Sequence, residues 1–323
     1  MKIIAYNVFV GYLCRNLARL MKTALNTLKK TYTFASIIED FKQLTKVGLA
    51  LSVVFSSLAG YLLAVGADGF SFNVLALLAL GGYFMVGASN AFNQIIEKDL
   101  DAKMDRTKDR PVASGRMSVT TAFIIASVFT VAGIAILYTI NPKTAMFGAI
   151  SIFLYTCVYT PLKTITPLAV FVGALPGAIP FMLGWVAATG SFGIEPGILF
   201  MIQFFWQFPH FWAIGWFLFD DYKKGGFFML PTGKKNKATA LQIIMYTVWL
   251  ILISIFPVSG LTGELKLSIV AAILVFLSGI GLLYYGIRLY RNMDNKSAKA
   301  LMLASVGYIT LMQIIYVVDK FLQ

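Results

Sequence analysis

The chain alternates between long apolar stretches and short charged ones. Nine runs of 19 or more residues contain no Asp, Glu, Lys or Arg: 47–67, 69–96, 117–142, 144–162, 164–194, 196–219, 238–263, 267–287 and 300–318. As a helix, a run of this length can cross the hydrocarbon core of a bilayer, which is about 30 Å thick. Lipid cannot satisfy exposed backbone groups, so helices are expected. The pattern predicts an all-α, polytopic membrane bundle with nine transmembrane helices over residues 47–323.

The basic residues divide unevenly between the two ends of these runs. If the N-terminus is cytoplasmic, all but three of the 27 Lys and Arg residues lie on the cytoplasmic side, and the exceptions are Lys143, Lys266 and Lys320. Cytoplasmic loops of membrane proteins carry an excess of Lys and Arg. The sequence therefore predicts an N-in/C-out orientation, with the loops after the second and sixth runs in the cytoplasm.

Residues 1–46 precede the first run and contain no span. Their apolar stretch Ile3–Cys14 is 12 residues long, which is shorter than a membrane span. We expect a basic cytoplasmic N-terminal arm that lies on anionic lipid. An organelle transit peptide and a later start at Met21 are the alternatives.

Composition supports the membrane interpretation. The chain is 59% hydrophobic and 13% charged, with a mean hydropathy of +0.78, which is too apolar for a soluble domain. We attribute the net charge of +13 to one membrane face and expect no nucleic-acid partner. Cys14 and Cys157 are too far apart in the sequence to form a metal or redox motif.

The loop after the second run is densely charged. In NQIIEKDLDAKMDRTKDRP, residues 93–111, ten of nineteen residues carry a charge. Asn93, Glu97 and Asp101 are spaced four residues apart and share one face if the helix continues. Oxygen ligands stacked in this way repel one another unless a cation lies between them, and such ligands suit Mg²⁺. The spacing predicts a magnesium site, whereas Asp99 points away and is expected to be solvated.

Basic residues follow in the same segment. Arg106 and Arg110 are again four residues apart, with Lys103 and Lys108 beside them. A guanidinium group matches phosphate oxygens with two parallel hydrogen bonds. In this segment, acids that can hold a cation lie beside arginines that can hold an anion. The combination predicts a site for a metal-bound polyphosphate. The alternative is a solvated loop whose charges pair among themselves.

A second polar loop, FDDYKKGGFFMLPTGKKNK at 219–237, repeats these ingredients in shorter form. Asp220 and Asp221 end the sixth run, and Lys223 and Lys224 follow. Two loops of this kind on one membrane face are suited to clamp one diphosphate through Mg²⁺. An ordinary polar loop has a similar composition, so that alternative stays open.

The sixth run is rich in aromatic residues. The stretch 203–217 contains eight of them in fifteen positions, together with His210, the single histidine of the chain. Aromatic faces can stabilise a carbocation or pack on a flat ring, and an interfacial aromatic belt is the alternative. One histidine excludes bis-histidine haem ligation within the chain. The absence of carboxylates from the runs argues against ion-coupled transporters and proton pumps.

Three stretches carry a family resemblance: residues 93–111, YTPLK at 159–163 and PHFWAIGWFLFDDYKKGGFFMLP at 209–231. In this order they resemble the UbiA-type intramembrane prenyltransferases and, among these, the branch that farnesylates haem. The resemblance implies nine helices and Mg²⁺-dependent transfer of a farnesyl group from farnesyl diphosphate to a vinyl group of haem B (protohaem IX). Water adds as well, and the product is haem O for haem-copper oxidases.

Ten residues are expected to form the site. The resemblance gives roles to seven of them, Tyr159 and Lys224 are two further candidates, and His210 is expected to contact haem as the only imidazole in the aromatic-rich run. The residues expected to hold Mg²⁺ and to be required for catalysis are Asn93, Glu97, Asp101 and Asp221. The residues expected to bind substrate are Arg106, Arg110, Tyr159, Lys163, His210 and Lys224. The chain departs from the family pattern at Glu97, where Asp is usual, and at LTKVG (44–48) in place of LTKPR. It also has Gly225 where the second motif often has another Asp, as is common in the haem branch.

Farnesyl diphosphate, haem B and the lipid bilayer are the implied partners, with haem A synthase or oxidase assembly factors as further protein partners. The implied location is a bacterial plasma (inner) membrane with the active site on the cytoplasmic side, and a mitochondrial inner membrane is the alternative. Two other functions stay open: a UbiA-type enzyme with another acceptor, such as a quinone precursor, and a non-catalytic carrier of lipid or haem.

Overall fold

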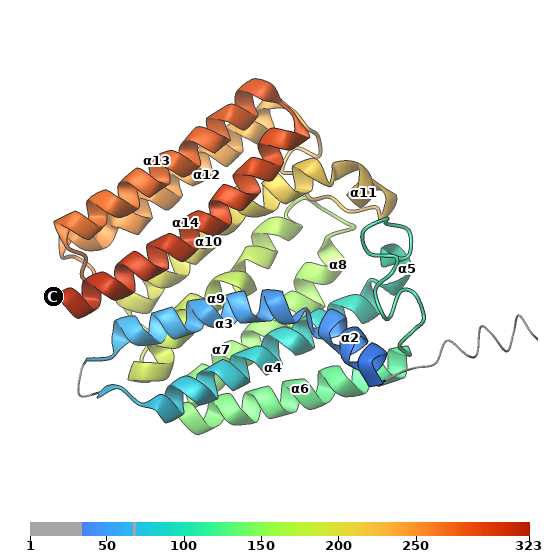
Figure 1. The fold of residues 1–323 in the computed structure, drawn as a ribbon, viewed down its shortest axis with the longest axis horizontal. Coiled ribbons are helices and arrows are strands. Elements are labelled where there is room, and N and C mark those ends of the chain that lie inside the picture. The colour runs from blue at the N-terminus through green and yellow to red at the C-terminus, as the bar shows by residue number, and fades with distance from the viewer. Residues whose placement is uncertain (1–33, 67–68) are drawn as a thin grey trace, which may run out of the picture. The chain divides into compact units, whose positions relative to one another are not determined.

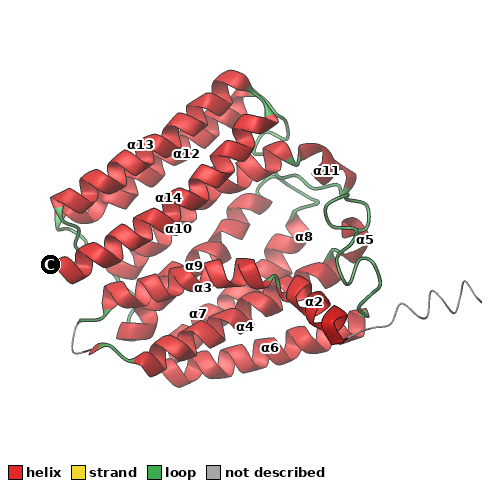
Figure 2. Cartoon of the chain, viewed as in Figure 1, coloured by secondary structure: helices red, strands yellow, loops and turns green. Residues whose placement is uncertain are grey.

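The computed structural model describes residues 34–66 and 69–323 (Figure 1). Over these residues the regular elements are all helical, with no strand (Figure 2). The chain divides into a unit that ends at Phe41 and a unit of Lys42–Gln323. Apart from the first part of helix α2 (Phe34–Thr45), everything described below belongs to the second unit. The predicted arm, residues 1–46, lies largely outside the described residues, and helix α2 is its described part.

Each of the nine charge-free runs coincides with a helical segment in the described part of the chain. The segments are α3 (Val47–Ala64), α4 (Phe72–Ile96), α6 (Val119–Ile140), α7 (Pro142–Phe153) with its continuation to Leu162, α9 (Ala169–Thr189), α10 (Ile194–Phe217), α12 (Lys237–Ile255), α13 (Ile269–Asn292) and α14 (Asn295–Leu322). Eight of them are long and apolar enough to cross a membrane, and α10 is not one of the eight. Its 24 residues are long enough, but polar side chains such as Gln203, Gln207 and His210 make it less apolar.

Side-chain caps explain where several of these helices begin. The side chains of Ser118, Ser268 and Asp294 precede α6, α13 and α14, and each accepts a hydrogen bond from the backbone N–H three residues later. A cap of this kind satisfies an N–H group that has no partner inside the helix. Polar residues directly before these three helices therefore set where the helices begin.

The centre of the bundle is α9, the most buried of the candidate spans. It packs against α3 and α10, and α10 in turn packs against α12 and α14. The contact between α3 and α9 depends on glycine. A Cβ at Gly60 would lie 2.0 Å from the carbonyl oxygen of Phe181, and one at Gly184 would lie 1.9 Å from that of Ser57. Membrane helices approach closely through small residues in this way.

Prolines interrupt the backbone hydrogen bonding of α9. Pro176 and Pro180 lie inside the helix, and a proline has no N–H for the carbonyl four residues earlier. Pro180 therefore leaves the carbonyl of Pro176 without its helical partner, and Ser151 Oγ of α7 donates to that oxygen at 3.3 Å. A neighbouring helix thus satisfies a backbone group that lipid could not satisfy.

The fourth segment changes its helical form part-way along. α7 continues into the π-helical turn η2 (Leu154–Tyr159) and then α8 (Thr160–Leu162). The N–H of Thr160 bonds the carbonyl of Tyr155, five residues back, which is the π-helical pattern. Single π turns inside α-helices are frequent at functional sites, and this one carries Tyr155 and Tyr159 just before Lys163.

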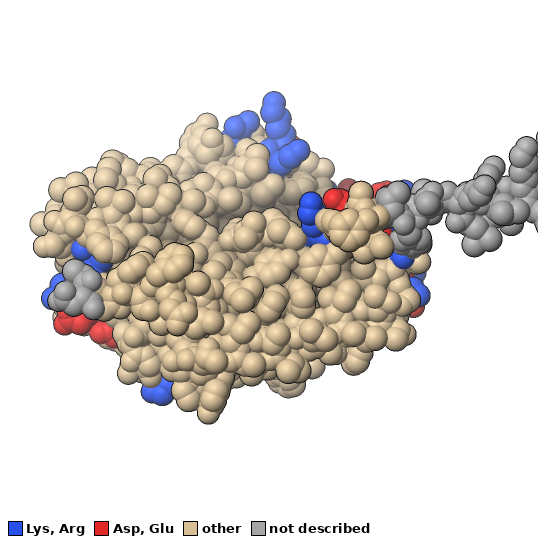
Figure 3. Space-filling view, turned by 60° about the horizontal axis from the view of Figure 1, so that its bottom comes forward, with Lys and Arg blue, Asp and Glu red and all other residues tan. Residues whose placement is uncertain are grey.

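Charged side chains avoid the broad surface of the bundle. Figure 3 shows an extended surface of uncharged residues across the helices, with Lys, Arg, Asp and Glu at its margins. Exposed residues such as Val131 and Ile269, each about 70% accessible, are apolar. Because charge is costly in hydrocarbon, this distribution is the one expected of a membrane-embedded surface.

Candidate active site

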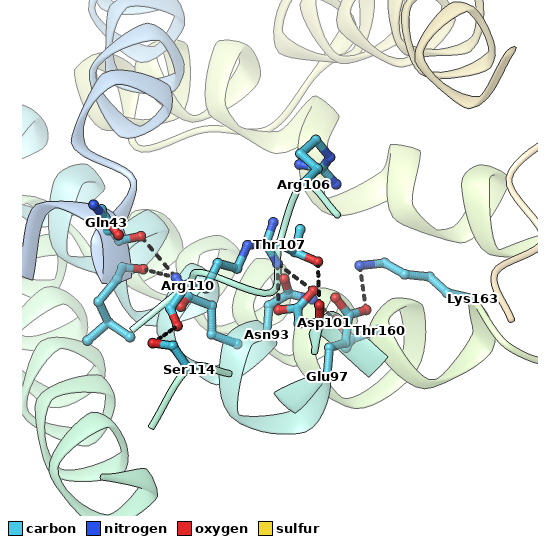
Figure 4. Close-up of polar contacts among 12 residues, drawn as sticks. Gln43, Asn93, Glu97, Asp101, Arg106, Thr107, Arg110, Ser114, Thr160 and Lys163 are labelled. Carbon is cyan, nitrogen blue, oxygen red and sulfur yellow. Dashed lines mark hydrogen bonds and ion pairs between the residues drawn. The ribbon is translucent and has the colours of Figure 1, made fainter. Parts of the chain in front are cut away.

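The predicted stack of oxygen ligands forms at the end of α4. The N–H of Glu97 bonds the carbonyl of Asn93 at 2.9 Å, and the N–H of Asp101 bonds the carbonyl of Glu97 at 2.7 Å. Helical spacing therefore carries through from α4 into the short helix α5 (Lys98–Asp101). All three side chains are buried, whereas Asp99 is exposed as predicted. Figure 4 shows the three on one side of the helix end.

Each of the two carboxylates has a cation of its own (Figure 4). Lys163 Nζ lies 2.8 Å from Glu97 Oε1, and Arg110 Nη1 lies 2.9 and 2.7 Å from the two oxygens of Asp101. Burial raises the pKa of Asp101, and the nearby Arg110 opposes that shift. Removing one partner of a buried ion pair is costly, and each of these acids has its cation within 2.8 Å.

The acid cluster opens into a cavity of about 650 Å³. Helices α3, α4, α9, α10 and α14 and the turn η2 contribute to its walls. Eight of the ten predicted site residues line it: Asn93, Glu97, Asp101, Arg106, Arg110, Tyr159, Lys163 and His210. The structure therefore brings the first acidic motif, the basic residues and the aromatic wall of α10 around one space.

Asp221 and Lys224 do not line this cavity. They belong to α11 (Phe219–Lys224). The Asp221 carboxylate accepts hydrogen bonds from the backbone N–H of Asp105 at 2.7 Å and of Arg106 at 3.4 Å. Lys224 forms an ion pair with Asp105, which lowers the pKa of that carboxyl and raises the pKa of Lys224. In this conformation both residues hold the two polar loops together.

Other residues of the second loop do reach the cavity. Tyr222 lines it, with the guanidinium of Arg106 5.7 Å from its ring centroid. The N–H of Phe228 bonds the carbonyl of Lys163 at 2.8 Å. The second loop therefore contacts Lys163 through a backbone hydrogen bond and Arg106 through the ring of Tyr222.

Lys46 is a cavity residue to which the sequence analysis gave no role. It precedes α3, lines the cavity and has a left-handed backbone with φ of 49°. Its side chain is half-buried. Burial, reinforced by the charges of Arg110 and Lys163, lowers the pKa of Lys46 to about 7. The feature of the sequence that could have indicated a role for Lys46 is its position, as a basic residue directly before the first span.

The donor set fits a magnesium ion. Within the described residues, no three His, Cys, Asp or Glu side chains form a ready-made ligand group. Magnesium, however, usually uses only one or two carboxylates, together with waters and substrate phosphates. The buried carboxylates of Glu97 and Asp101 and the amide oxygen of Asn93 offer hard oxygen ligands of this kind. Cationic side chains beside them can take the phosphate oxygens.

Comparison with known proteins identifies the family. The model of the UbiA prenyltransferase family matches residues 53–310. The chain belongs to the UbiA prenyltransferase family. A curated relative from Christiangramia forsetii, named protoheme IX farnesyltransferase, is 70% identical over 289 residues, which are 90% of this chain and 96% of the relative. One of the same name from Flavobacterium psychrophilum is 67% identical over 302 residues, 93% of this chain and 100% of the relative.

Solved structures share this fold. A structure of a digeranylgeranylglyceryl phosphate synthase has a TM-score of 0.73 at 16% identity and covers 88% of this chain and 99% of its own. A UbiA homologue from Archaeoglobus fulgidus bound to DMAPP and Mg²⁺ has a TM-score of 0.67 at 15% identity. The match covers 88% of this chain and 98% of the homologue. The predicted family resemblance is confirmed, and the chain is an integral membrane protein.

Proposed function

We propose that this protein transfers a farnesyl group from farnesyl diphosphate to a vinyl group of haem B, which gives haem O. The observation that carries the proposal is one cavity that joins a buried acid–cation cluster to an aromatic wall with the single histidine. The first part suits a diphosphate and the second a flat, apolar ring. The names of the close relatives, protoheme IX farnesyltransferase, support this choice of donor and acceptor.

The residues at the polar end would bind the diphosphate. Lys163 and Arg110 now pair with Glu97 and Asp101, and they would turn toward phosphate oxygens when substrate enters. Asn93, Glu97 and Asp101 would hold Mg²⁺, with Asp221 as the further ligand that the family resemblance suggests. When bound, the metal neutralises negative charge on the leaving diphosphate.

The reaction breaks the allylic carbon–oxygen bond of farnesyl diphosphate and forms a carbon–carbon bond to the terminal carbon of the vinyl group. Water then adds to the other vinyl carbon and loses a proton, and diphosphate leaves. The cavity residues aid this chemistry in two ways. Arg106, Arg110 and Lys163 stabilise the departing negative charge, and the apolar walls keep the carbocation away from bulk water.

The finer membrane arrangement is also part of the proposal. We propose nine spans, with α10 included, and an N-in/C-out orientation. The active site would lie on the cytoplasmic side of a bacterial plasma membrane, and a mitochondrial inner membrane is the alternative. The distribution of Lys and Arg supports the orientation. In a variant without Cys14 and Cys157, a cysteine at Lys108 should be labelled only from the cytoplasm and one at Glu264 only from the opposite side. The reverse pattern would overturn the orientation.

The decisive experiment incubates the purified protein in nanodiscs with haem B, farnesyl diphosphate and Mg²⁺. The mass of the haem should increase by one farnesyl group and one hydroxyl group. Parallel reactions with 4-hydroxybenzoate test the quinone-precursor alternative, and release of diphosphate tests the carrier alternative. Prenylation of the phenolic acceptor without any change in haem, or no diphosphate release at all, would contradict the proposal. Haem A synthase and oxidase assembly factors remain the proposed protein partners.

A further inference from the structure

The ring of His210 is held by two side chains. It stacks on Trp206, with centroids 4.6 Å apart and 19° between the planes. Its Nδ1 lies 2.8 Å from Oγ of Ser305, a buried residue of α14 that is 95 positions away in the sequence. Trp206 also bonds to α14, because its Nε1 donates to the backbone carbonyl of Ser305 at 2.6 Å. Stacking fixes the plane of the imidazole, and the serine fixes its rotation within that plane.

Ser305 also determines which ring nitrogen carries the hydrogen. The hydroxyl group has one hydrogen, and it is donated to the carbonyl of Met302 at 2.7 Å. The hydroxyl can then only accept from His210, so Nδ1 carries the ring hydrogen and Nε2 has a free lone pair. The imidazole also bonds the backbone of Met302, the residue whose carbonyl accepts the Ser305 hydroxyl, and in the described residues Nε2 is not among the buried side-chain atoms without a partner. Because His210 lines the cavity, this lone pair is open to it.

We propose that Ser305 is a positioning residue that presents Nε2 of His210 to the iron of haem B. This inference rests on the proposed function, since it concerns how the acceptor is oriented. A histidine that binds a metal almost always donates its other ring N–H to an acceptor, which fixes the tautomer and makes the ligand more basic. Ser305 is that acceptor. Iron held at His210 would fix the porphyrin in the cavity, so that the same vinyl edge meets the farnesyl diphosphate in each turnover.

The test measures binding of haem B to the purified protein by absorbance and by resonance Raman of the ferrous complex. The unaltered protein should show an axial imidazole with an iron–histidine stretching band. A His210→Gly variant should lose this band, and added free imidazole should restore it. A Ser305→Ala variant should keep the histidine but bind haem about 10- to 100-fold more weakly. It should also shift the iron–histidine band to lower frequency, because a less basic imidazole binds iron less strongly.

Two matched variants separate positioning from a general effect on the helices. Ser305→Thr keeps a hydroxyl group and should leave the affinity and the band near those of the unaltered protein. Ser278→Ala removes a serine of α13 that makes the same kind of bond, Oγ to the carbonyl of Val275 at 2.7 Å, but has no histidine beside it. It should change neither measurement, and farnesyl diphosphate binding should be unchanged in all three serine variants.

The outcomes distinguish this inference from the proposed function. If the unaltered protein farnesylates haem but Ser305→Ala leaves haem affinity and the band unchanged, the positioning role is wrong and the function stands. An absent axial imidazole in the unaltered protein would also overturn the inference, because it would mean that His210 does not present Nε2 to iron. If haem is bound through His210 but never farnesylated, the proposed function fails while the positioning role holds.

Discussion

The buried ion pair between Lys163 and Glu97 allows stability and catalysis to be tested separately. The two side chains are 9% and 4% exposed, and 2.8 Å separates Nζ from Oε1. In the described residues Glu97 has no other side-chain hydrogen-bond partner. A Lys163→Met variant would therefore leave a buried carboxylate unpaired. Removing one partner of a buried pair costs about 3–5 kcal/mol, and we expect a loss of that size in the free energy of unfolding.

The double variant Lys163→Met/Glu97→Gln removes both charges together. Replacing a whole buried ion pair by uncharged groups is often nearly neutral, so its stability should return to within about 1 kcal/mol of the unaltered protein. Transfer of the farnesyl group should stay severely impaired, because the cation for the diphosphate is still missing. Unfolding would be followed by titrating SDS into mixed micelles, and transfer by the mass of the haem. If the double variant were as unstable as the single one, an unpaired Glu97 would not be the cause of the loss.

Three further predictions concern the metal site and the packing. Asp101→Ala should nearly abolish transfer of the farnesyl group, whereas Glu97→Asp should retain much of it. Normal turnover of Asp101→Ala at limiting Mg²⁺ would contradict the metal site. Because burial raises the pKa of Asp101, protons compete with the metal at higher pH than at an ordinary aspartate. The Mg²⁺ concentration for half-maximal transfer should therefore rise as the pH falls, and a value independent of pH would argue against a metal ligand there. Gly60→Ala should destabilise the bundle by more than about 1 kcal/mol, the cost of overpacking. Gly48→Ala should not destabilise it, because an added Cβ there has no atom within 4 Å. Thermal unfolding measures both changes.

The sequence predicted those features of the protein that depend on local pattern. Freedom from charge located all eight helices that are long and apolar enough to cross a membrane, since hydrocarbon excludes charge. The four-residue spacing placed Asn93, Glu97 and Asp101 on one face, because helical geometry alone determines that relation. The family resemblance added Lys163, which no local pattern connects to the acids, whereas His210 stood out as the single histidine of an aromatic-rich run.

Other features depend on how distant segments meet. Nothing in the spacing indicates that the Asp221 carboxylate would accept two backbone N–H groups from the first loop, because that contact depends on loop conformation. The partner of Glu97 was equally hidden, since Lys163 is 66 residues away in the sequence. α10 is less apolar than its charge-free run suggested, because a search for charged residues does not register the uncharged polar residues inside it.

The π-helical turn η2 lets the fourth segment hold one residue more than a regular α-helix would over the same stretch. In a regular α-helix one extra residue turns everything beyond it by about 100°, whereas the wider turn absorbs that residue and nearly keeps the orientation of the helix that follows. Lys163 therefore stays on the side on which Glu97 lies. In the evolution of this segment, loss of one residue within η2 should be accepted more readily than loss of one residue from α7, because only the second change turns Lys163 away from Glu97.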